Sequence, residues 1–102
     1  MILPELWSGV VELKALNRAE YGAAGAFTNI VTWARDAQEF RTKADTIAAT
    51  LSMYVAQVEN VAPIGESSDD WHEEFEDMVR RAETNPNAII YGTFHTYPHD
   101  QA

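Results

Sequence analysis

The sequence predicts one small α+β domain, a two-layer sandwich in which two helices lie on one face of a four-stranded mixed sheet. Two observations lead to this class. Segments with strand-like alternation and segments with helical spacing follow one another in the order β-β-α-β-α-β. The 102 residues are 46% hydrophobic and 11% aromatic, which is typical of a single folded domain with its own core.

The first two strands are predicted from apolar residues that recur at every second position. Residues 6–16 and 26–34 both show this pattern, with Val11 and Val31 among the alternating side chains. The intervening residues 17–25 contain two glycines and several polar side chains, which is typical of a loop. We expect the two strands to pair as an antiparallel hairpin.

A helix is predicted to follow Asp36. The Asp36 side chain can accept a hydrogen bond from the first turn, and Glu39 stands three residues further on, as a capping box requires. Glu39 is also expected to pair with Lys43 across one turn. One apolar stripe runs along this helix and consists of Ala37, Phe40, Ala44, Ile47, Ala48 and Leu51.

Residues 54–61 are predicted to form the third strand, which ends before Pro63. A second helix is expected to begin at Ser67 or Ser68, and Pro86 lies where it should break. Its apolar stripe consists of Trp71, Phe75, Met78, Val79 and Ala82. Acidic residues at its start and arginines near its end follow the order that the helix dipole favours.

Residues 88–97 form the last predicted strand, and residues 96–102 are expected to be a loose tail of the domain. Alternation places Tyr91, His95 and Tyr97 on one face and leaves apolar residues on the other. If both crossovers progress the same way, both helices lie on one face and roughly 400 Å² of sheet stays open. That area is near the largest apolar patch of a typical monomer, so we expect a second copy to cover it.

The element count fits a sandwich related to the ferredoxin-like group, although a chain that begins with a hairpin departs from the usual βαββαβ order of that group. The chain contains no cysteine, which excludes disulfides and thiolate chemistry. The sequence shows neither a signal peptide nor an apolar run long enough for a bilayer, so we expect a cytoplasmic protein.

The net charge of −9 is concentrated in the last third of the chain. Residues 1–65 carry five basic and seven acidic side chains, a net −2, whereas residues 66–102 carry two basic and nine acidic ones, a net −7. An anionic surface repels phosphate groups, so binding to nucleic acid or to an acidic membrane is disfavoured. Any partner selected by charge is expected to be basic.

The open face contains the best candidates for a ligand site, which are Tyr91, His95, Tyr97 and Glu59. A carboxylate beside an imidazole could support acid–base chemistry if the two strands were neighbours. The pair of His95 and His99 predicts no metal site, because residues four apart in an extended chain are about 13 Å apart. No cofactor is predicted either.

The second helix carries a cluster of acidic residues, of which Asp70, Glu73 and Glu74 lack an obvious basic neighbour in the sequence. A solvated helix face is the simplest interpretation of this cluster. The alternative interpretation is a docking surface for a basic protein.

Together these patterns predict a small acidic homodimer that acts as a binding or regulatory module without catalysis of its own. Two alternatives remain open. One is a cofactor-free enzyme or small-ligand binder with a pocket near Tyr91, His95 and Tyr97. The other is an immunity-type inhibitor that binds a basic protein through the acidic second helix.

Overall fold

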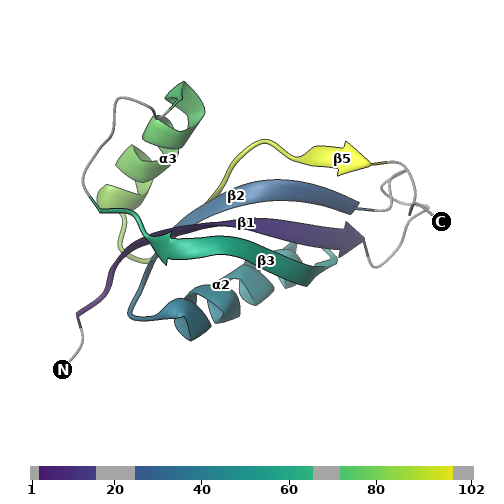
Figure 1. Ribbon diagram of the computed structural model, residues 1–102, viewed down its shortest axis with the longest axis horizontal. Helices are drawn as coiled ribbons and strands as arrows, with labels where there is room; N and C mark the ends of the chain where they lie inside the picture. Colours follow the sequence, from purple (N-terminus) through teal and green to yellow (C-terminus); the bar gives the residue numbers. More distant parts are fainter. Residues whose placement is uncertain (1–2, 16–24, 66–71, 98–102) are drawn as a thin grey trace.

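The computed structural model describes residues 3–15, 25–65 and 72–97, which form an antiparallel sheet and two helices (Figure 1). The elements are β1 (Glu5–Ala15), β2 (Gly25–Ala34), α2 (Ala37–Thr50), β3 (Met53–Pro63), α3 (Glu73–Glu83), β4 (Ile89–Tyr91) and β5 (His95–Tyr97). The predicted α+β class is confirmed. In these described ranges, no helix has the length and apolar character needed to cross a membrane.

The predicted hairpin of the first two strands is confirmed, but the prediction of a mixed sheet is wrong. The strand order is β3-β1-β2-β4, and β5 also pairs with β2. β2 and β3 run parallel to each other, yet they lie on either side of β1 and do not pair. Since β4 and β5 run antiparallel to β2, every ladder of the sheet is antiparallel. The predicted relation to the ferredoxin-like group is not confirmed by this order.

One face of the sheet, called the first face, packs against α2. The predicted Asp36 cap of this helix is confirmed, since Asp36 Oδ1 accepts from the backbone N–H of Glu39 at 2.8 Å. The helix stripe and the strand residues of matching parity form a single core. Its buried members are Val11, Leu13, Ile30, Ala34, Phe40, Ala44, Ala48, Met53 and Val55.

The other face, called the second face, packs against α3 near one end of the sheet (Figure 1). The apolar stripe of α3 contacts strand residues of the opposite parity, among them Leu6, Val31 and Ile90. The prediction that both helices lie on one face is therefore wrong. The physical reason is that these three residues make the second face apolar as well, so it too requires cover.

The second helix begins later than the sequence pattern indicates. α3 starts at Glu73, and its N-cap His72 makes no side-chain capping bond. The predicted caps Ser67 and Ser68 lie outside the described residues. At the other end of the helix, Arg81 Nε and Asp77 Oδ2 form an ion pair at 2.9 Å.

β3 forms one edge of the sheet, and its outer edge is irregular. Two register shifts interrupt its pairing with β1, and at one of them Asn60 adopts a positive φ of 55°. Gly9 of β1 lies opposite this bulge, where an added Cβ would come within 2.9 Å of a methyl carbon of Val61. The strand then ends at Pro63, which has no N–H to offer to a further strand.

The opposite edge is built from two short strands instead of one long one. β4 and β5 have three residues each and both pair with β2. Thr96 and Tyr97, which were expected in a loose tail, thus belong to β5, and residues 98–102 lie outside the described ranges.

Two tryptophans place their indole N–H groups in contrasting surroundings. Trp33 Nε1 donates to the carbonyl oxygen of Ala82 at 2.7 Å, which ties β2 to the last turn of α3. Trp7 Nε1 is buried and has no hydrogen-bond partner in the part of the chain that the structure describes. A buried donor without a partner carries a desolvation cost that the Trp33 donor avoids.

This contrast predicts different stabilities for two equivalent substitutions. We expect Trp33→Phe to lower the free energy of unfolding by about 1–2 kcal/mol, because it removes a hydrogen bond between two elements. We expect Trp7→Phe to change it by less than about 1 kcal/mol, because the relieved desolvation offsets the smaller ring. Urea unfolding of both variants tests this, and a larger loss for Trp7→Phe than for Trp33→Phe would contradict it.

Candidate functional site

Two residues predicted to share a site on the last strand lie on different faces of the sheet. Tyr91 pairs with Ile30 and belongs to the first face, whereas His95 pairs with Phe27 and belongs to the second. Three residue steps separate the two β2 partners, but four steps separate Tyr91 from His95. The one extra residue reverses the alternation, so the prediction that Tyr91 and His95 share a face is wrong.

Glu59 is not brought next to His95 either. Glu59 lies on β3 opposite Val10 and therefore shares the second face with His95. β3 and β5 are at opposite edges of the sheet, and three strand spacings separate them by about 14 Å. The two side chains thus cannot form the proposed acid–base pair. The backbone of Tyr97 pairs with Gly25 at the same edge as His95.

The other histidines are also apart from His95. His72 precedes α3, and its ring meets the edge of Phe75 with centroids 6.4 Å apart. His99 lies outside the described residues. In residues 3–15, 25–65 and 72–97, no three histidine, aspartate or glutamate side chains are grouped so that they could hold a metal ion.

The acidic face of α3 is partly used within the fold. Glu74 accepts hydrogen bonds from the backbone N–H of Thr93 at 2.8 Å and from its hydroxyl at 2.6 Å. These two bonds favour the charged carboxylate and lower the pKa of Glu74 below its usual value. An added Cβ on Gly92 would collide with Glu74 Oε1, so a larger residue there would push this carboxylate away from its position. Glu73 is exposed, and Asp70 lies outside the described residues.

Tyr91 lines a shallow hollow of about 350 Å³ between α3 and β4. Glu74 and Thr93 line it too, but His95 does not. The hollow is therefore a feature of the edge where α3 meets β4, and it does not join the candidate residues of the last strand into one site.

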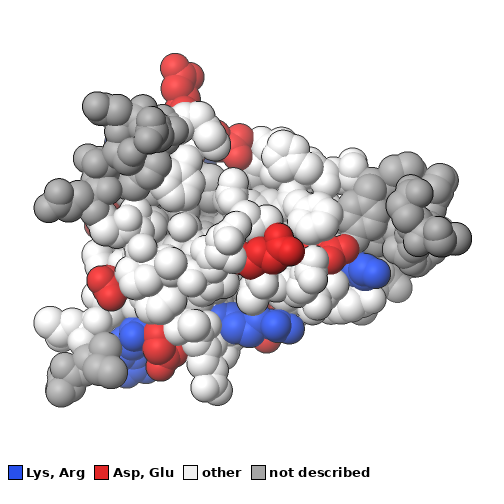
Figure 2. Space-filling view, viewed as in Figure 1, with Lys and Arg blue, Asp and Glu red and all other residues white. Residues whose placement is uncertain are grey.

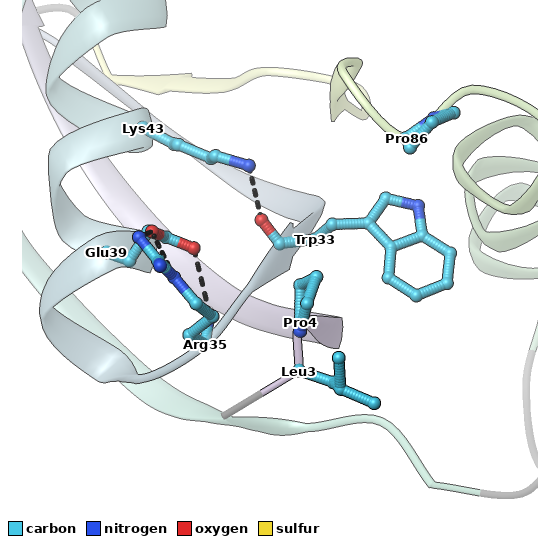
Figure 3. A pocket seen from close by; sticks show the side chains of 7 residues that line it. All are labelled: Leu3, Pro4, Trp33, Arg35, Glu39, Lys43 and Pro86. Carbon is cyan, nitrogen blue, oxygen red and sulfur yellow. Dashed lines mark hydrogen bonds and ion pairs between the residues drawn. The ribbon is translucent and has the colours of Figure 1, made fainter. Parts of the chain in front are cut away.

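A larger pocket, of about 470 Å³, lies at the end of β2 and was not predicted (Figure 3). We call it the end pocket. Its walls come from four parts of the chain: the residues before β1, the end of β2, α2 and the α3–β4 connection. The lining residues are Leu3, Pro4, Trp33, Arg35, Glu39, Lys43 and Pro86.

The end pocket exists because β4 is shorter than β2. The last pairing of the two strands is Thr32 with Ile89, so β2 continues past its partner from Trp33 onward. Lys43 of α2 reaches this uncovered edge and donates a hydrogen bond from its Nζ to the Trp33 carbonyl oxygen. The predicted pair of Glu39 with Lys43 is thereby replaced by a contact between helix and strand.

One wall of the end pocket is charged. Arg35 donates from Nε and Nη2 to Glu39 Oε2 at 3.1 and 2.8 Å, and its backbone N–H donates to Glu39 Oε1 at 2.9 Å. These bonds lower the pKa of Glu39 and raise that of Arg35, because each favours the charged form. Lys43 lies on the same side of the pocket (Figure 3).

The facing wall is apolar. The Trp33 indole lies between Pro86 on one side and Pro4 and Leu3 on the other (Figure 3). Its ring is held in place by the Nε1 bond to Ala82. Leu3 is 75% exposed, the highest value among the large apolar side chains of the described chain.

The sequence contained a partial signal for this pocket. Arg35 follows directly on a strand whose next-to-last residue is Trp33, and Lys43 lies two turns into the next helix. The position of the pocket depends on where the pairing of β4 stops, however. The sequence pattern of residues 88–97 predicts one continuous strand and does not show where this pairing stops.

A comparison of the chain with protein-family models, with curated proteins and with solved structures finds no match.

The contacts of Glu74 predict a pH-dependent stability. Folding lowers the pKa of Glu74, so the charged carboxylate stabilises the folded state. This stabilisation is fully present above the unfolded-state pKa of about 4.3 and is lost as the pH falls through the lower folded-state pKa. We expect Glu74→Gln to be less stable than wild type at neutral pH and the two to converge in acid.

Thermal unfolding from neutral pH down to acid measures this difference. Glu73→Gln is the matched control, since Glu73 is the neighbouring acid on α3 and makes no bond to Thr93 in the described structure. A stability gap between wild type and Glu74→Gln that stays constant with pH would show that the carboxylate charge does not act through Thr93.

Proposed function

We propose that this chain is a small acidic binding or regulatory module that works as a homodimer and has no catalysis of its own. The observation that supports the proposal is the part of the second face that lies beyond α3, which we call the distal face. Its side chains have the parity of the second face but are not part of the α3 core. They are Val10, Glu12, Lys14, Phe27, Asn29, Tyr54, Gln57, Glu59 and His95.

The distal face contains apolar and aromatic groups among polar ones. Val10 and Phe27 are half-buried, and Tyr54 is 48% exposed. Figure 2 views the molecule as in Figure 1 and shows mainly uncharged side chains over the middle of the sheet, with a few acidic and basic groups among them. Aromatic and aliphatic groups on an accessible sheet face favour association with another surface.

The extent of the distal face sets the expected strength of the dimer. α3 occupies one end of the second face, so less than the roughly 400 Å² expected for a whole open face is available. Stable interfaces bury about 800 Å² on each partner, so we expect a weak dimer that dissociates on dilution. The net charge of −9 on each copy opposes association, so added salt should strengthen the dimer by screening.

Binding of a basic protein through α3 is the second candidate and predicts the opposite effect of salt. An acidic surface that docks on a basic partner loses affinity as salt rises. In the described structure this surface retains Glu73, while the charge of Glu74 is already bonded to Thr93. The second candidate therefore has less support than the dimer.

The dimer proposal predicts that an aspartate at Tyr54 disrupts association. A charge placed in a contact between two acidic copies should weaken dimerisation at least about tenfold. Tyr91→Asp is the matched control, because Tyr91 is 42% exposed and belongs to the first face. Sedimentation velocity over a range of protein and salt concentrations measures the effect.

Two results would overturn the proposal. One is a wild-type protein that sediments as a monomer even at the highest concentration. The other is a dimer that Tyr54→Asp leaves intact while Tyr91→Asp dissociates it.

A further inference from the structure

The end pocket is a cationic site in a strongly acidic protein. The chain has seven lysines and arginines against sixteen acidic residues, yet two of the seven line this one pocket. Arg35 and Lys43 face a single acid there, Glu39, so the lining carries a net charge of +1. A local positive charge of this kind selects against cations and attracts an anion.

Both cationic groups keep donors that form no hydrogen bond within residues 3–15, 25–65 and 72–97. The Lys43 ammonium has three N–H donors, and one of them binds the Trp33 carbonyl oxygen. Arg35 directs one N–H each from its Nε and Nη2 to Glu39, which leaves the second N–H of Nη2 and the two of Nη1. A carboxylate could accept from these remaining donors without displacing any bond of the fold.

The other half of the lining suits an apolar group. Trp33 offers a flat ring whose orientation is fixed by its bond to Ala82, so no ordering of that side chain is needed on binding. Pro4 and Pro86 are rigid, and Leu3 is 75% exposed, so covering it removes apolar surface from water.

We propose that the end pocket binds a small hydrophobic carboxylate. Its carboxylate accepts from Lys43 and Arg35, and its apolar body covers Leu3 and the ring of Trp33. The volume of about 470 Å³ lies in the range typical of small-molecule sites. A dianionic phosphate fits less well, because Glu39 already balances one of the two cations and the apolar wall would remain unused. This site is separate from the distal face and does not depend on the dimer.

The binding test uses two probes of the same shape. We expect 3-phenylpropionate to shift the NMR signal of the Trp33 indole N–H in a saturable way, with that signal assigned from Trp33→Phe. We expect 3-phenylpropionamide, which lacks the charge, to bind at least about tenfold more weakly. No saturable shift with the carboxylate, or equal affinities for the two probes, would overturn the proposal.

Variants test the residues that define the site. Lys43→Met should weaken binding of 3-phenylpropionate at least about tenfold. Arg41→Met is the matched control, since Arg41 lies on the same helix, pairs with Asp45 at 3.3 Å and does not line the pocket. Equal affinities for these two variants would overturn the proposal.

Leu3→Asp keeps the test decisive if Lys43→Met does not fold. Leu3 is highly exposed, so its replacement should leave the fold intact while it adds a negative charge beside the apolar wall. We expect this variant to lose binding of 3-phenylpropionate, and unchanged binding by folded Leu3→Asp would overturn the proposal.

Discussion

The two central strands carry apolar side chains on both of their faces, and the rest of the fold is arranged to cover them. On β1, Val11 and Leu13 point to one side and Leu6 to the other. A sheet of this kind is stable only when it is covered on both sides, and each helix supplies one layer. α2 lies along the first face, whereas α3 covers one end of the second and is held there by the bond from Trp33 to Ala82.

The second constraint is the mismatch in length between β2 and its outer neighbours. β2 has ten residues, but β4 has three, so the last residues of β2 pair with β1 on one side and have no strand on the other. The fold satisfies the Trp33 carbonyl there with Lys43 instead of a further strand. Lys43 therefore lies close to the rings of Trp33, Pro4 and Pro86, and together these residues line the end pocket.

The parts of the fold that could be predicted are those that local pattern determines. The hairpin follows from alternation, and the start of α2 follows from Asp36 and Glu39. The face chosen by α3 could not be predicted, because periodicity identifies an apolar side but not the layer that it meets. The positions of Tyr91 and His95 depended on one extra residue near Gly92, which looks like ordinary alternation in the sequence. The end pocket could not be predicted either, because it depends on where β4 stops pairing with β2.

The irregular outer edge of β3 limits how copies of this protein can join. Strand addition in the plane of a sheet needs a straight row of unsatisfied N–H and C=O groups, and the bulges near Asn60 and the ring of Pro63 interrupt that row. This edge of the sheet is therefore a poor template for an added strand, and the bulges that bend it away from a straight row disfavour edge-to-edge stacking there.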